Sequence, residues 1–166
     1  MARVADAKVP EGLPDFNIFK SMAHNHHVQK GYGDLGGRLL YRGTLDPRLR
    51  ETVINAISVK TGCAYEWSHH VGIGRQAGMT DDELRAIRDG ALGELGDTER
   101  LYIDYAHKVE DMQVTDDDVA KLRSAGLSDE QIVELTVLAG FYGMTARYLL
   151  ALDVAIDEGN AGFDVP

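Results

Sequence analysis

The sequence contains a single cysteine, and this scarcity limits the redox chemistry open to the chain. Cys63 is the only cysteine among 166 residues. An internal disulfide needs two cysteines, and so does the paired-cysteine motif of thiol oxidoreductases. Both are excluded, which suits a reducing compartment. Any chemistry of Cys63 must proceed without a second cysteine from the same chain.

Basic residues are also scarce relative to acidic ones. The chain has 17 Lys and Arg against 27 Asp and Glu, which gives a formal net charge of -10. A surface of this charge keeps a protein in solution and repels nucleic acids and anionic lipids. We therefore expect neither a nucleic acid nor a membrane as a partner.

Long apolar runs of the kind that span a bilayer are missing. The longest apolar stretches, such as residues 132–142, are short and interrupted, and residues 1–12 lack the apolar core of a signal peptide. These absences predict a cytoplasmic protein.

No segment shows the alternating apolar and polar pattern of a strand, and no linker or internal repeat divides the chain. We therefore predict a single all-α domain, a helical bundle of about seven or eight helices. Pro10, Gly12 and Pro14 predict that residues 1–14 form an extended N-terminal arm, which leaves residues 15–166 as the helical domain.

Helix boundaries are marked by capping residues and glycines. Asp15 or Asn17 is expected to cap a helix that runs to about Val28, and residues 34–41 form a second helix. Gly62 and Gly78 are placed to end later helices, and the last helix is expected to reach about residue 156. Four further starts carry an N-cap with proline at the first helical position or a capping box: Asp46 with Pro47, Thr80 with Glu83, Thr115 with Asp118, and Ser128 with Gln131.

Groups that can move protons collect in residues 51–70. On a helix, Glu66 and His70 stand four residues apart on one face, and Cys63 precedes Glu66 by three residues on the same side. A carboxyl group and an imidazole with an ordinary pKa near 6.5 form a pair suited to acid/base catalysis.

The spacing of this cluster resembles the signature of the carboxymuconolactone decarboxylase and alkyl hydroperoxidase D superfamily. That signature is Glu, eleven residues, Cys, two residues, Cys, three residues, His, and here Glu51, Cys63 and His70 match three of its four positions. The resemblance extends over most of the chain, through the stretches NIFKSMAHN, LDPRLRETVI, TGCAYEWSHHVGIGRQAGMTDDEL and FYGMTARYLLAL. It implies a hydroperoxidase D-like helical subunit that assembles into homotrimers or homohexamers, with pockets near subunit contacts.

Glu66 stands where the family has its second cysteine, and this difference decides between the two branches. The peroxidase branch needs a second cysteine to resolve the oxidised thiol, so the resemblance argues against that activity. The decarboxylase branch needs a proton donor. We therefore predict catalysis by Glu66 and His70 on a small unsaturated carboxylic acid or lactone, with Glu51 orienting His70 or tuning its pKa.

Several alternatives stay open at this point. The Glu66 and His70 pair suits either of two reactions, decarboxylation or proton-transfer isomerisation. A thiol-dependent hydroperoxidase using Cys63 with an external thiol is a second class of function, and a non-catalytic oligomeric binding protein is a third.

The remaining site residues are predicted from their position beside the pair. Cys63, Trp67 and His69 are expected to line the substrate pocket. The clusters His24, His26, His27 and His69, His70 lack the spacing that would join them into one metal site, so we expect no metal and no cofactor.

Overall fold

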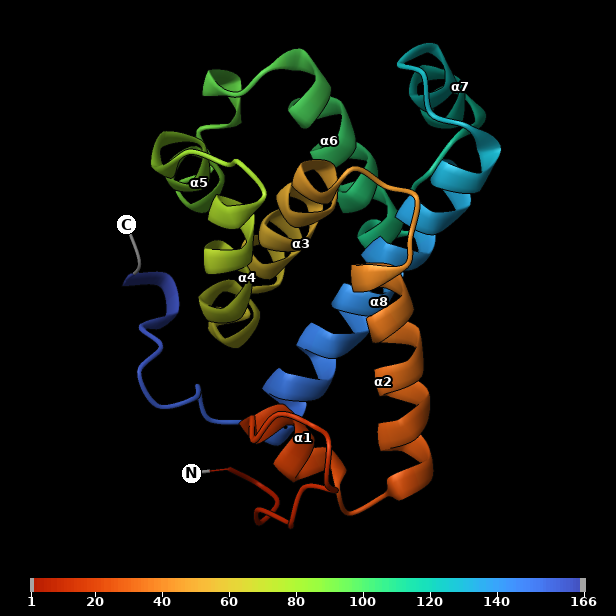
Figure 1. The fold of residues 1–166 in the computed structure, drawn as a ribbon. Coiled ribbons are helices and arrows are strands. Elements are labelled where there is room, and N and C mark those ends of the chain that lie inside the picture. The colour runs from red at the N-terminus through yellow and green to blue at the C-terminus, as the bar shows by residue number, and fades with distance from the viewer. Residues whose placement is uncertain (1, 165–166) are drawn as a thin grey trace.

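The structure is a computed structural model that describes residues 2–164, and within those residues it contains helices and no strand. Two short 3-10 turns, η1 (Leu92–Glu94) and η2 (Gly162–Asp164), accompany the longer elements. The α-helices of the described part are α1 (Asn17–Met22), α2 (His26–Tyr41), α3 (Pro47–Thr61), α4 (Ala64–Gln76), α5 (Asp81–Arg88), α6 (Asp97–Asp111), α7 (Asp116–Ser124) and α8 (Asp129–Leu152). The predicted all-α bundle is confirmed (Figure 1).

The four helix starts marked by capping residues are all present. The Asp46 side chain accepts hydrogen bonds from the backbone N–H groups of Arg48 at 2.9 Å and Leu49 at 3.2 Å. Complete capping boxes begin α5, α7 and α8. Each box satisfies two backbone donors that a helix start otherwise leaves unpaired, which is why local sequence is enough to place these boundaries.

The first two helices and the end of the last one differ from the prediction. The first helix stops at Met22, and α2 begins at His26 because the Asn25 side chain accepts a hydrogen bond from the Val28 backbone N–H at 3.2 Å. At the other end of the chain, α8 stops at Leu152 because Asp153 takes a left-handed conformation with φ of 51°. Asn and Asp tolerate such non-helical positions better than most residues.

Helix α3 forms the centre of the bundle. It packs against α4, α5, α6 and α8, and every residue from Glu51 to Ser58 is buried (Figure 1). A helix surrounded on several sides has little freedom to move, because its side chains interlock with those of its neighbours. Polar groups on α3 are therefore held in fixed positions inside the core.

Helix α8 is long and apolar enough to cross a membrane by length and composition, which the sequence analysis did not anticipate. Half of its most apolar window is buried inside the bundle, as in the core helix of a globular protein. It supplies buried residues to the largest apolar cluster, among them Leu135, Leu138 and Phe141. Its composition is accounted for by this packing.

The N-terminal residues lie against the end of α8. The Arg3 backbone N–H donates to the Leu152 carbonyl at 2.8 Å, and the Ala7 N–H donates to the Lys20 carbonyl at 3.2 Å. No helix occurs between residues 2 and 16. The division into an arm over residues 1–14 and a helical domain over residues 15–166 stays a prediction, and residues 1, 165 and 166 lie outside the described part.

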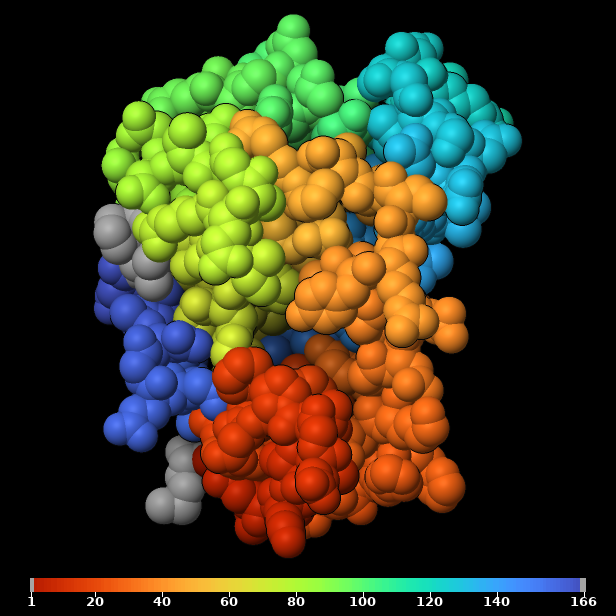
Figure 2. All heavy atoms as spheres, in the orientation of Figure 1, coloured from red at the N-terminus to blue at the C-terminus, as the bar shows by residue number. Residues whose placement is uncertain are grey.

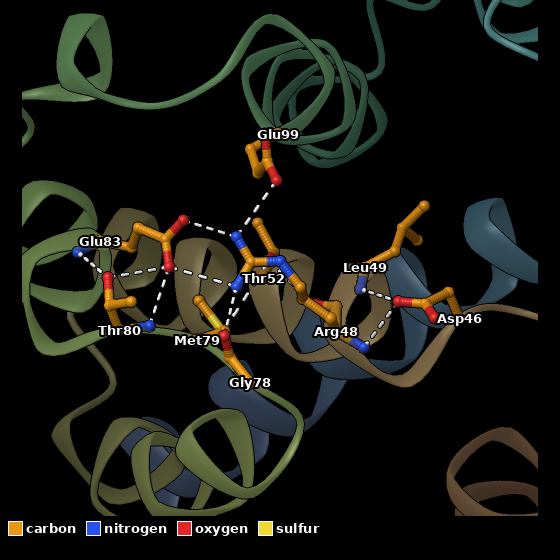
Figure 3. Close-up of polar contacts among 9 residues, drawn as sticks. All are labelled: Asp46, Arg48, Leu49, Thr52, Gly78, Met79, Thr80, Glu83 and Glu99. Atoms are coloured by element: carbon orange, nitrogen blue, oxygen red, sulfur yellow. Dashed lines mark hydrogen bonds and ion pairs between the residues drawn. The ribbon is translucent and has the colours of Figure 1, made fainter.

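A polar cluster around Arg48, near the start of α3, joins α3 to α5 and α6 (Figure 3). The Arg48 guanidinium donates to both carboxylate oxygens of Glu83, at 2.5 and 3.1 Å, and to Glu99 at 3.2 Å. It also donates to the Gly78 carbonyl at 2.8 Å. The Arg48 guanidinium lowers the pKa of Glu83 from 4.5 to about 2, with a further contribution from the hydrogen bonds of its capping box.

We expect Glu83→Gln to lower the free energy of unfolding by about 1–2 kcal/mol at pH 7, because it removes a charged hydrogen bond but keeps the capping geometry. The stabilisation by a depressed pKa is present above pH 4.5 and is lost as the pH falls towards 2. Urea unfolding at a series of pH values should therefore show the difference between wild type and variant shrinking below pH 4.5.

The matched control is Asp82→Asn in the same helical turn, because the Asp82 side chain is 88% exposed. This change should alter stability by at most about 0.5 kcal/mol. A Glu83→Gln protein with wild-type stability at pH 7 would contradict the role given to the Arg48 cluster.

Candidate active site

A hydrogen bond between Glu51 and His70 joins α3 to α4. His70 Nδ1 lies 2.8 Å from Glu51 Oε2, and the other oxygen of Glu51 accepts from Arg50 Nε at 2.9 Å. Gly62, with φ of 70°, provides the left-handed turn that folds α4 back along α3. The Asn55 side chain adds a second link, since its Nδ2 donates to the backbone carbonyls of Glu51 and His70.

This arrangement selects the form of the imidazole. A carboxylate accepts hydrogen bonds, so the proton of a neutral His70 lies on Nδ1 and leaves Nε2 unprotonated. No hydrogen bond to Nε2 is found among residues 2–164, and the His70 ring packs edge-on against Tyr142 with ring centres 5.0 Å apart. Nε2 is therefore available to accept a proton.

Glu66 lies one helical turn before His70, and its carboxyl group is buried without a hydrogen-bond partner. The residue is 3% exposed, and neither carboxyl oxygen has a partner within the described chain. Burial raises the pKa of Glu66 well above its ordinary value of 4.5, while the neighbouring Cys63 thiol offsets part of this rise. Burial thus favours the neutral, protonated form of this group.

A cavity of about 310 Å³ opens beside these two residues. Glu66 and His70 lie in its wall, together with side chains from the N-terminal arm, α1, α2 and α8. Figure 2 shows the arm and α1 (red), α2 (orange) and α4 (yellow-green) around a hollow with atoms of α8 (blue) at its back. The cavity is at the small end of the range for ligand pockets, so it suits a small molecule.

Cys63 lies outside this cavity. It is 1% exposed, precedes the first residue of α4 and packs in an apolar cluster with Tyr65 and Ile18. Burial and the nearby Glu66 carboxyl group raise the pKa of the Cys63 thiol well above its ordinary value. A protonated, enclosed thiol is a poor nucleophile.

His69 forms a second polar cluster at the rim of the cavity. Its Nε2 lies 2.8 Å from Asp157 Oδ2, and the Tyr65 hydroxyl donates to the same oxygen. The other oxygen of Asp157 accepts from the Asn17 backbone N–H at 2.8 Å. Asp157 thereby connects the C-terminal segment to α1 and α4, and Phe16 covers the His69 ring edge-on at 4.8 Å.

Comparison with solved structures shows the same fold in proteins of known structure. An uncharacterized peroxidase-related protein from Silicibacter sp. TM1040 aligns with a TM-score of 0.82 and 20% identity, over 97% of this chain and 94% of that one. The alkylhydroperoxidase AhpD core protein from Ralstonia eutropha JMP134, also peroxidase-related, aligns with a TM-score of 0.80 and 22% identity, over 95% and 93% of the two chains.

Sequence comparison adds the family. Residues 27–101 match the Carboxymuconolactone decarboxylase family. This match and the fold together support a relationship of the chain to the carboxymuconolactone decarboxylase and alkyl hydroperoxidase D superfamily. YnjA of Escherichia coli (strain K12), itself uncharacterized, is 32% identical over 117 residues, which make up 68% of this chain and 63% of that protein. The aligned part of the chain thus spans less than two thirds of YnjA.

The three residues Glu51, Glu66 and His70 come together in the structure, although Glu66 and His70 are not hydrogen-bonded to each other. Glu66 and His70 share the cavity wall, but His70 makes its hydrogen bond to Glu51 on the neighbouring helix. Glu51 itself is fully buried behind His70 and does not line the cavity. The catalytic roles of all three stay predictions.

Two of the residues predicted to line the pocket lie elsewhere. Trp67 is fully buried in an apolar cluster with Leu84 and Ile103, on the side of α4 that faces away from the cavity, and Cys63 is enclosed beneath Glu66. Trp67 differs from the prediction because helix periodicity turns its side chain towards the core. His69 does line the cavity.

The sequence did not indicate several groups that the structure places at the site. Tyr32, Phe141 and Tyr142 line the cavity, and Asp157 holds His69 from a position 88 residues further along the chain. No local pattern signals contacts over such separations. The FYGMTARYLLAL stretch contains two of these aromatic residues and is part of the family resemblance, but the sequence does not indicate that it lines a pocket.

No group of three His, Cys, Asp or Glu side chains that could hold a metal ion is found within residues 2–164. His24, His26 and His27 are exposed at the start of α2, apart from the cavity. The absence of a resident metal or cofactor stays a prediction.

Glu66 gives a pH dependence of stability that can be measured. A carboxyl group whose pKa is raised on folding keeps its proton in the native state after the unfolded chain has released it, so stability falls as the pH rises above about 4.5. We expect Glu66→Gln to be more stable than wild type, by a margin that widens between pH 5 and pH 9 in thermal unfolding.

The control is Glu94→Gln, because Glu94 is exposed in η1. Its stability should follow that of wild type at every pH. A Glu66→Gln protein that parallels wild type across the whole range would mean that Glu66 ionises in the folded protein as it does in water.

The enclosed thiol should react slowly. We expect iodoacetamide to label Cys63 at pH 8 at least about 100-fold more slowly in the folded protein than in urea, because burial limits both access and thiolate formation. Mass spectrometry of timed samples measures both rates on the same cysteine, so the unfolded protein is its own control. Rapid labelling of the folded chain would show a reactive thiol.

Proposed function

We propose that the protein is a carboxymuconolactone decarboxylase-like enzyme that moves a proton on a small unsaturated carboxylic acid or lactone. The observation that supports this most is the buried, unpartnered carboxyl group of Glu66, placed in one cavity wall with the imidazole of His70. A buried carboxyl group without a partner lowers the stability of the fold. Its presence in the cavity wall therefore favours a chemical role.

Glu66 is the proton donor of this proposal. Its raised pKa favours the protonated form, and its place in the cavity wall would bring this proton close to a ligand. A general acid works best when its pKa is near the operating pH. Glu66 would regain its proton from solvent after each turnover.

His70 is the base, or the group that stabilises developing negative charge. Its Nδ1 proton is held by Glu51, which directs Nε2 to the cavity side of the ring. Glu51 does not reach the cavity and is a positioning residue, and its charge is balanced by Arg50. If His70 becomes protonated, the Glu51 carboxylate stabilises the imidazolium.

The same two groups suit two reactions. In decarboxylation the bond to the carboxylate carbon breaks, its electrons form a dienolate, carbon dioxide leaves and Glu66 protonates carbon. In isomerisation His70 removes a proton next to a carbonyl group, and Glu66 returns one at another carbon. Neither reaction needs a redox partner.

The thiol-dependent alternative finds no support in the position of Cys63, which is enclosed and does not line the cavity. Assembly into homotrimers or homohexamers and a cytoplasmic location stay predictions. Exposed apolar residues on α8, such as Val133, Val137 and Met144, are compatible with a subunit contact.

The test is a screen of small unsaturated acids and lactones, with carbon dioxide release and double-bond migration followed by proton NMR. We expect Glu66→Gln and His70→Asn to lower kcat by at least about 100-fold on any compound that wild type converts, because each removes a proton-transfer group. Glu94→Gln, far from the cavity, and Cys63→Ala should retain most of the activity.

A Glu66→Gln enzyme as active as wild type on every compound would refute the acid/base proposal. Hydroperoxide consumption with dithiothreitol, abolished by Cys63→Ala, would instead establish the thiol-dependent alternative. Thermal unfolding of each variant separates loss of chemistry from loss of fold.

A further inference from the structure

The described lining of the cavity lacks a side chain with a permanent positive charge. Among the described residues that line it, none is Lys or Arg. Its two imidazoles already face carboxylates, since His70 pairs with Glu51 and His69 with Asp157. In their neutral form these rings supply no positive charge to the cavity.

An anionic ligand would lose its hydration in this cavity without gaining an opposite charge. Removing a carboxylate from water is unfavourable unless it is paired and hydrogen-bonded. The net charge of -10 adds repulsion as such a ligand approaches. A neutral ligand meets neither penalty.

Helix α2 contributes glycines to the cavity wall. Gly36 is required by packing, since a Cβ there would lie 3.0 Å from the Phe141 ring. Gly33 and Gly37 also line the cavity, yet a Cβ at either position would meet nothing within 4 Å. Each glycine weakens a helix by about 1 kcal/mol relative to alanine. Because neither position is crowded, packing does not explain why Gly33 and Gly37 are glycines.

Aromatic rings form the wall contributed by α8. Phe141 stacks on Tyr32 with ring centres 4.9 Å apart and meets Tyr142 edge-on at 5.4 Å. All three line the cavity. A cavity lined by aromatic rings of α2 and α8 and by glycines without a crowding neighbour suits a flat ring.

We infer that the cavity binds a neutral, unsaturated ring compound with a carbonyl group, such as a lactone or cyclic enone, and that Gly33 and Gly37 determine its specificity by leaving room for the ring. This inference rests on the acid/base function proposed above and narrows its substrate class. Of the two reactions, it selects double-bond isomerisation, because decarboxylation requires a carboxylate.

The atoms balance in this reaction without a co-reactant. His70 Nε2 takes a proton from the carbon between the double bond and the carbonyl group, and the electron pair spreads into a dienolate. Glu66 gives its proton to the far carbon, so the double bond moves and nothing is oxidised. His70 and Glu66 then exchange protons with solvent.

The test is calorimetric binding of a matched pair of probes at pH 7.5, coumarin and coumarin-3-carboxylate. These share one ring system and differ in the negative charge. We expect coumarin to bind the full-length protein at least about 10-fold more tightly, in line with an unpaired buried charge. Equal or tighter binding of the carboxylate would overturn the inference.

Two glycine variants test the specificity role on the same helix. Gly33→Leu should weaken coumarin binding at least about 10-fold, because its side chain extends from the cavity wall. Gly31→Leu is the control, since Gly31 is exposed on α2, outside the cavity, with equal room for a side chain. Both variants should have raised melting temperatures, because each removes a glycine from a helix.

The outcomes separate this inference from the proposed function. Selective coumarin binding that is blocked by Gly33→Leu, with no compound converted by wild type, supports the ligand class and refutes the acid/base function. Glu66-dependent release of carbon dioxide from unsaturated acids supports the function and overturns the ligand class. Unchanged coumarin binding in Gly33→Leu also overturns the inference.

Discussion

The hydrogen bond from His70 to Glu51 joins the two helices on which the site is built. Glu51 belongs to a stretch of α3 in which every residue is buried, so its carboxylate is positioned by the core of the bundle. This bond fixes the position of the imidazole relative to α3. A reactive group held in this way needs little reorganisation when a ligand arrives, and preorganisation is a large part of what a protein contributes to catalysis.

Glu66 shows the opposite relation between site and fold. Its carboxyl group is buried beside the apolar walls of the cavity and finds no partner in the described chain, so it weakens the bundle that carries it. The buried Glu51 carboxylate is paired with His70 and Arg50, and the half-buried Asp157 carboxylate is paired with His69. The contrast separates carboxylates that hold the structure together from a buried carboxyl group that lacks such a partner.

The sequence predicted those features that depend on neighbouring residues. Capping residues such as Thr80 and Ser128 marked helix starts because their hydrogen bonds close within three positions. The break at Asn25 was not predicted, although the Asn25 side chain caps α2 by the same rule. Trp67 was assigned to the pocket because it adjoins Glu66 in sequence, whereas neighbours on a helix point about 100° apart.

Features that depend on distant residues could not be read from the sequence. The superfamily motif predicted that Glu51 and His70 come together, because it summarises a long-range contact in its spacing. No such motif covers Asp157 or the aromatic wall of α8, and these became visible only in the folded chain. Nothing in the sequence linked the glycines of α2 to a cavity either.

The rim of the cavity is built from the two ends of the chain. Asp157 ties the C-terminal segment to the start of α1, and Leu13, Pro14 and Phe16, which precede α1, form part of the cavity wall. The part that matches the Carboxymuconolactone decarboxylase family, residues 27–101, holds the acid/base groups but neither of these ends. If the function proposed above holds, the wall of the cavity and the chemistry within it are carried by separate stretches of chain, so that a change at the ends could alter which molecule fits without touching Glu66 or His70.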